Sequence, residues 1–230
     1  MSTLKILIFS FVVIVLPLPT AAQVAKVYPV DEAVRDPEFF VFRAHLLVAV
    51  QQKDVTYLSS ILAANILNSF GGDGGVDEFK ATWKAEEPTS KVWNTLAEIL
   101  ALGGQFRPPD EWSEGARTFA APYTYSVQPS AGEDPFLYGV VVGRGVKVRQ
   151  EPTTTSAVVA NLSFDVIRVT DWAPKVMPED VRLNSWVAVE LADGRPGFIA
   201  SEFVRSRNGY RAIFIRQNGR WMLRALVAGD

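Results

Sequence analysis

The chain has 230 residues, of which 48% are hydrophobic and 21% are charged, a composition that excludes a disordered, collagen-like or coiled-coil protein. Its formal net charge of −2 at pH 7 argues against non-specific binding to nucleic acid, whose phosphate backbone attracts basic proteins. There is no cysteine, which excludes a disulfide framework, a thiol nucleophile and a lipid-bearing cysteine.

The first 22 residues have the pattern of a secretory signal peptide. Lys5 provides a basic start, residues 6–16 form an apolar run, and small residues precede a cleavage point after Ala22. The apolar run is shorter than the roughly 20 residues that a membrane-spanning helix needs, and an uncleaved anchor is the alternative. We therefore predict a periplasmic or secreted protein with no stable membrane span after cleavage.

Helical signals dominate the region that follows. Apolar residues recur at helical spacing in four segments: residues 37–52, a short stretch after Asp54, residues near 76–84, and a stretch after Ser90. Residues 30–127 are therefore predicted to form a domain that is mainly helical.

The segment "FGGDGG", residues 70–75, has the glycine content of a ligand-binding loop. No Lys-Ser or Lys-Thr pair follows it, as a phosphate-binding loop requires. Asp73, Asp77 and Glu78 lie close together, but their spacing is not the alternating oxygen pattern of a calcium loop. We expect the glycines to turn the chain into a helix, with Glu78 reaching back to cap it, and we expect no metal site.

Strand signals replace the helical ones after residue 115. The segment "ARTFAAPYTYSV", residues 116–127, is aromatic and favours β-structure, and short apolar runs alternate with turn residues over 136–206. Over residues 209–230, apolar and polar side chains alternate on both sides of Asn218-Gly219. This pair is a strong hairpin signal because both residues accept positive φ. These patterns predict an α+β protein in which the C-terminal hairpin completes a small sheet of the helical domain, beside an all-β unit.

Several motifs of the all-β unit occur in a characteristic order. "VKVRQEP" at residues 146–152 is followed by a polar Thr/Ser loop, Trp186 opens a later strand, and "DGRPGFI" at 193–199 precedes "SEFV" at 201–204. In these motifs, residues 143–204 resemble the bacterial SH3-like (SH3b) domain. The resemblance implies a small closed barrel that binds peptides or peptidoglycan.

The resemblance also implies a ligand-binding surface on the barrel. Aromatic rings offer stacking area, and an arginine can pair with a carboxylate. The residues concerned are Arg149, Glu151, Trp172, Phe198 and Phe203. Three departures from the family pattern occur: Gln150-Glu151 replaces a small residue plus glycine, Phe198 stands where tryptophan is commoner, and the loop from Trp172 to Ser185 is longer than usual. Trp186 is expected in the core.

The flanking segments, 30–127 and 209–230, resemble the cone-shaped α+β domains of the nuclear-transport-factor-2-like type. This resemblance implies a barrel inserted into one α+β domain, although chain order also allows two domains in tandem. Such cones can hold a pocket, and the alternative site there comprises His45, Trp83 and Trp93. The simpler interpretation places the tryptophans in the core.

The sequence therefore favours an exported, non-enzymatic binding protein with no catalytic residue, cofactor or metal. Its expected partner is peptidoglycan or a peptide of an envelope protein. Two alternatives stay open: a small-molecule binder or enzyme that uses a pocket in the helical domain, and a structural adaptor for another envelope protein, which a broad exposed apolar patch would favour.

Overall fold

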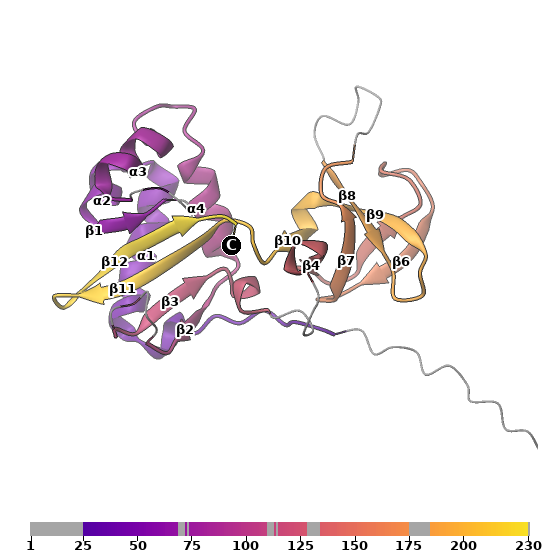
Figure 1. The fold of residues 1–230 in the computed structure, drawn as a ribbon, viewed down its shortest axis with the longest axis horizontal. Helices are drawn as coiled ribbons and strands as arrows, with labels where there is room; N and C mark the ends of the chain where they lie inside the picture. Colours follow the sequence, from indigo (N-terminus) through magenta and orange to yellow (C-terminus); the bar gives the residue numbers. More distant parts are fainter. Residues whose placement is uncertain are drawn as a thin grey trace, which may run out of the picture.

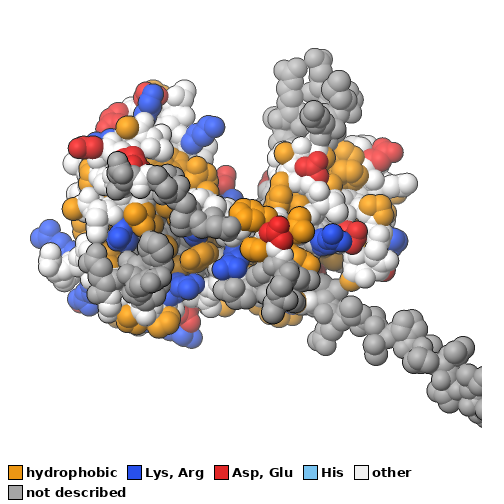
Figure 2. Space-filling view, viewed as in Figure 1, with side chains coloured by type: hydrophobic (Ala, Val, Ile, Leu, Met, Phe, Trp, Pro, Cys, Tyr) orange, Lys and Arg blue, Asp and Glu red, His pale blue; other side chains and the backbone are white. Residues whose placement is uncertain are grey.

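The structure is a computed structural model that describes residues 25–68, 72, 74–109, 113, 115–127, 134–174 and 185–229. It contains helices and two sheets, which confirms the α+β class (Figure 1). The predicted signal segment, part of the glycine cluster and most of the loop after Trp172 lie outside the described residues. Figure 2 shows the two sheet-containing parts as separate lobes that meet in the lower half of the view.

All four predicted helices are present. They are α1 (Pro37–Gln52), α2 (Val55–Ser60), α3 (Val76–Trp83) and α4 (Val92–Ala101), preceded by the 3-10 turn η1 (Ala33–Arg35). Helix α1 begins where the Asp36 side chain accepts a hydrogen bond from the Phe39 amide at 3.0 Å. It ends at Lys53, whose φ of 53° is left-handed.

A five-stranded sheet carries these helices. Its strands are β1 (Leu62–Leu67), β2 (Gln105–Arg107), β3 (Thr118–Ala121), β11 (Arg211–Gln217) and β12 (Arg220–Val227), in the order β1-β12-β11-β3-β2. The hairpin predicted at Asn218-Gly219 is confirmed, with φ values of 49° and 77° at its turn. This C-terminal hairpin occupies the middle of the sheet, between β1 and β3, which both come much earlier in the chain.

Aromatic side chains fill the space between the helices and this sheet, and Figure 1 shows α1 lying behind the strands. Phe39 of α1 is fully buried, and its ring centroid lies 4.2 Å from that of Phe119 and 4.8 Å from that of Trp221. Phe106 and Phe214 approach the same ring to 5.6 Å each. The first hydrophobic core is therefore centred on one phenylalanine.

The second sheet has seven strands. They are β4 (Tyr138–Val141), β5 (Val146–Arg149), β6 (Val158–Leu162), β7 (Val166–Asp171), β8 (Trp186–Glu190), β9 (Pro196–Ala200) and β10 (Val204–Ser206), in the order β10-β4-β7-β8-β9-β5-β6. Three 3-10 turns border the sheet: η3 (Tyr123–Ser126), η4 (Pro135–Leu137) and η6 (Ser201–Phe203).

The closed barrel that the sequence predicts is not shown. Among the described residues no ladder joins the edge strands β10 and β6, so the sheet is open. The physical reason is the shortness of β10, whose three residues all pair with β4 before the chain turns towards β11. The sheet is nonetheless curved, because Val204 of β10 and Val148 of β5 pack in the same core.

An N-terminal segment connects the two parts. The Val27 amide donates to the Phe164 carbonyl at 2.7 Å, and the Val166 amide donates to the Ala25 carbonyl at 2.8 Å. Lys26 forms an ion pair of 2.7 Å with the buried carboxylate of Asp165. The segment then runs beneath the junction of the two lobes to the helical part (Figure 1).

Replacing Lys26 by methionine is expected to loosen this segment. The buried Asp165 carboxylate keeps its bond from the Ser163 amide but loses its cationic partner, which costs about 1–2 kcal/mol because the lysine is partly solvated. Hydrogen exchange of the Val27 and Val166 amides should become faster, while that of the Phe119 amide in the other sheet stays unchanged. Unaltered exchange at Val27 and Val166 would contradict a role for the ion pair.

Candidate functional site

The five residues of the predicted ligand-binding surface do not form one site. Arg149 and Phe198 are Cα partners across β5 and β9, and Glu151 lies two residues beyond β5. Trp172 lies elsewhere, over Gly139 of β4, where its indole Nε1 donates to the Phe136 carbonyl at 2.8 Å.

Phe203 is also separate from Arg149 and Phe198. It belongs to η6 and is 40% exposed, and its ring faces Gly143, which follows β4. The structure therefore brings together Arg149, Phe198 and Glu151, and it leaves Trp172 and Phe203 on the β4 side of the sheet.

An outward row of side chains crosses three strands at one edge of the seven-stranded sheet. Gly197 and Ile199 of β9 are buried, so Phe198 between them points away from the core and is half-buried. Its partner Arg149 pairs in turn with Val158 of β6, which is 44% exposed. We call Phe198, Arg149 and Val158 the outer row. It places a guanidinium between two apolar side chains.

The loop beside the outer row is fixed by hydrogen bonds. Arg149 Nη1 donates to the Ser156 carbonyl at 2.7 Å. The Ser156 hydroxyl donates to the Glu151 carbonyl at 2.9 Å and accepts from the Glu151 amide at 3.1 Å. Within the described part of the chain, no carboxylate pairs with the Arg149 guanidinium. The guanidinium is thus held in place by a carbonyl, with donors left for an anionic group.

A second arginine lies near β6 but is already paired. Arg195 Nε donates to Asp193 Oδ2 at 2.8 Å, and this hydrogen bond lowers the pKa of the Asp193 carboxyl. Arg195 Nη1 also donates to the Val159 carbonyl of β6 at 3.1 Å. The Asp193 carboxylate is therefore paired with an arginine of its own turn and does not compete for Arg149.

Strand β6 leaves one edge without a neighbouring strand beside the outer row, although its Val159 carbonyl already accepts from Arg195. It is an edge strand, paired with β5 on one side only in the described topology. An exposed edge can accept an extended peptide as an additional strand, whose backbone pairs with the edge while its side chains meet those of the sheet. Val158 on this edge was not singled out from the sequence, because its place opposite Arg149 depends on a bulge after Val148.

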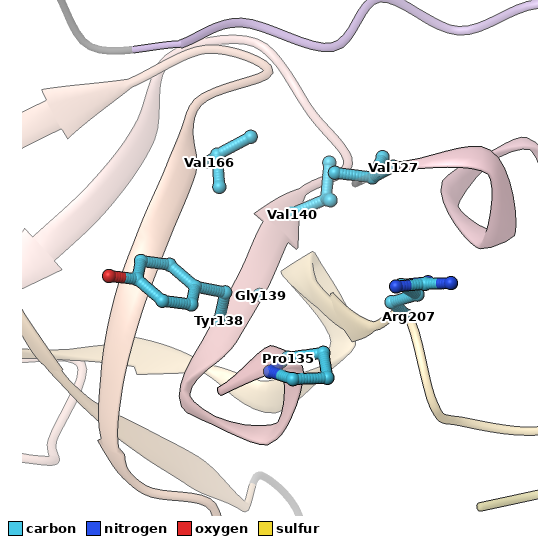
Figure 3. Close-up of a pocket in the computed structure, with 7 residues that line it drawn as sticks. All are labelled: Val127, Pro135, Tyr138, Gly139, Val140, Val166 and Arg207. Carbon is cyan, nitrogen blue, oxygen red and sulfur yellow. The ribbon is translucent and has the colours of Figure 1, made fainter. Parts of the chain in front are cut away.

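A shallow cleft lies on the β4 side of the same sheet (Figure 3). Its lining residues are Val127, Pro135, Tyr138, Gly139, Val140, Val166 and Arg207. The cleft has room for about one water molecule, so it does not hold a drug-sized or sugar-sized ligand. It is a feature of packing rather than a ligand pocket.

The alternative pocket in the helical part is not assembled. His45 is exposed on a flank of α1, whereas Trp83 and Trp93 are buried in the first core. Trp93 Nε1 donates to the Ala85 carbonyl at 3.2 Å, and the Trp83 ring packs against Tyr210 at a centroid distance of 5.2 Å. These three side chains therefore do not line a common cavity.

The described part of the glycine cluster is held by one carboxylate. Glu78 Oε2 accepts from the Gly74 amide at 2.9 Å, and Oε1 accepts from Asn68 Nδ2 at 3.1 Å. A Cβ at Gly72 would approach the same carboxylate to 2.7 Å. The expected reach of Glu78 back towards the loop is confirmed, and among the described residues no cluster of metal ligands is found. Phe70, Gly71 and Asp73 lie outside the described residues.

The outer row on the β6 edge is therefore the best candidate site in the described part of the chain. No described helix has both the length and the apolar character needed to cross a membrane. No family model, curated protein or solved structure gives a significant match to this chain.

Proposed function

We propose that this chain is an exported, non-enzymatic binding protein whose seven-stranded sheet is SH3-like and recognises peptide segments in the cell envelope. The observation that carries the proposal is the outer row on an edge strand. The periplasmic or secreted location rests on the signal-like pattern of residues 1–22.

The chemistry of the outer row favours a peptide that carries a carboxylate. Arg149 is the cation, Phe198 and Val158 supply apolar area on either side, and β6 supplies backbone donors and acceptors. Peptidoglycan stem peptides are short, have free carboxylates and contain small apolar side chains. We therefore propose stem peptides as the ligand, with Arg149 pairing their carboxylate.

Co-sedimentation with purified peptidoglycan tests this proposal. We expect residues 23–230, which include both cores, to pellet with peptidoglycan and a free stem pentapeptide to compete. Arg149→Met removes the charge and Phe198→Ala removes the ring. Arg149→Met should weaken binding about tenfold or more, because a hydrogen bond to a charged group contributes about 1.5–3 kcal/mol. Phe198→Ala should weaken binding about tenfold, because the apolar area that the ring buries contributes about 1.5–3 kcal/mol.

Phe203→Ala is the matched control, because it removes an exposed ring from the turn η6, which borders the same sheet and faces Gly143 rather than the outer row. It should bind as the unaltered protein does. Failure of the unaltered protein to bind either probe, or undiminished binding by Arg149→Met and Phe198→Ala, would overturn the proposal.

A further inference from the structure

Helix α1 carries apolar side chains on two opposite faces, and Glu38, Arg43 and His45 lie on the flanks between them. Its inner residues Phe39, Leu46, Ala49 and Val50 are buried in the first core. On the opposite face Phe40, Val41, Leu47 and Val48 are 48%, 53%, 38% and 50% exposed. Neighbouring apolar side chains that stay exposed on one helix face are typical of a contact surface, so the outer face is suited to a contact outside this chain. We call Phe40, Val41, Ala44, Leu47 and Val48 the α1 stripe.

Charged groups near the α1 stripe are already paired. Arg43 donates to both carboxylate oxygens of Asp31, at 2.5 and 2.6 Å, and Glu38 forms an ion pair with Arg216. The only arginine of α1 is thus paired and α1 has no lysine, whereas amphipathic membrane-surface helices usually present several lysines or arginines to anionic lipid. The α1 stripe therefore suits an equally apolar and uncharged protein surface.

The α1 stripe is symmetric about Ala44. At about 3.6 residues per turn, Ala44 lies at the centre of the stripe, Phe40 and Leu47 lie along one side, and Val41 and Val48 lie along the other. Ala44 is also at the midpoint of α1. If a second copy packs with its helix reversed, Phe40 meets Leu47 of that copy and Val41 meets Val48. The small Ala44 faces its own equivalent and allows close approach of the two helices.

We infer that the α1 stripe is the interface of a homodimer in which two α1 helices pack antiparallel about a two-fold axis through Ala44. The antiparallel arrangement also brings opposite ends of the helix dipoles together. Helix α1 is about 24 Å long, so the contact is smaller than a standard interface of about 800 Å² per partner. We therefore expect a reversible dimer with a dissociation constant on the order of micromolar. The dimer does not depend on the proposed peptide site, which belongs to the other sheet.

Paired charge substitutions test the arrangement. Val41→Asp and Val48→Lys should each give a monomer, because each buries an unpaired charge in the dimer. The double variant Val41→Asp Val48→Lys should dimerise again, because each aspartate then meets the lysine of the other copy. Sedimentation velocity of residues 23–230 from about 1 µM to about 100 µM measures this. Leu137→Asp, at a residue 41% exposed on the other lobe, is the control that should stay dimeric.

Cross-linking provides a second readout that does not depend on affinity. Because the chain has no cysteine, Ala44→Cys introduces one thiol, which lies beside its equivalent at the two-fold axis. Mild oxidation should yield a covalent dimer, whereas Ser59→Cys on the exposed side of α2 should not. A monomer at every concentration, dimers in both single-charge variants, or a double variant that stays monomeric without an Ala44→Cys cross-link would overturn the inference.

Discussion

Phe39→Ala is expected to lower the free energy of unfolding of the helical part by about 3–5 kcal/mol, the usual cost of removing a large buried ring. The Phe39 side chain is fully buried at the centre of the first core, and its ring contacts come from α1, β2, β3, β11 and β12. Because these rings belong to the sheet and the helix alike, the cavity cannot be closed by moving one element. Urea denaturation followed by tryptophan fluorescence measures the change.

The next residue in the chain provides the control. Phe40 has the same side chain but is 48% exposed on the outer face of α1, so Phe40→Ala should change the free energy of unfolding by less than about 1 kcal/mol in dilute solution. The residues of the second core are all different from those of the first. If the seven-stranded sheet unfolds in a separate transition, the urea concentration at its midpoint should therefore stay unchanged in Phe39→Ala. Equal losses for Phe39→Ala and Phe40→Ala would contradict the described packing.

The local parts of this fold could be predicted from the sequence. Asp36 and Pro37 mark the start of α1, and Asn218-Gly219 marks the turn of the C-terminal hairpin, because capping and positive φ are decided by neighbouring residues. The α+β class followed from these elements. Both resemblances, to the SH3-like domain and to the cone-shaped domain, stay predictions.

The long-range parts could not be predicted with the same success. Closure of the second sheet depends on whether β10 reaches β6, which the alternation of apolar residues does not determine. For the candidate site, residue types suggested Arg149 and Phe198, and the register places them side by side. The same reasoning grouped Trp172 with them, although it lies over β4. A sequence pattern identifies stacking and charged side chains, but strand order decides which of them meet.

Gly104→Ala is expected to be the second most damaging change, with a loss of about 3 kcal/mol in the free energy of unfolding. Gly104 lies between α4 and β2, where a Cβ would stand 2.3 Å from the Ala120 carbonyl oxygen and 2.6 Å from Phe119 Cε1. The first neighbour is backbone of β3 and the second is a ring packed on Phe39, so neither can move without disturbing the core. The methyl group therefore forces β2 away from β3.

A second glycine, with no atom close to the place of a Cβ, provides the control. Its substitution shows how much stability is lost by adding a methyl group that clashes with nothing. Gly219 in the hairpin turn has a φ of 77° and no atom within 4 Å of the place that a Cβ would take, so Gly219→Ala carries only backbone strain of about 1–2 kcal/mol. Hydrogen exchange gives a local readout, because the Glu32 amide donates to the Gly104 carbonyl at 2.9 Å and should exchange faster in Gly104→Ala alone. If the two variants lose equal stability and the Glu32 amide stays protected, then β2 and β3 do not approach each other as described. If Gly104→Ala loses more stability, a residue without a side chain at position 104 is required for the close contact between β2 and β3 that lets the helices cover the sheet.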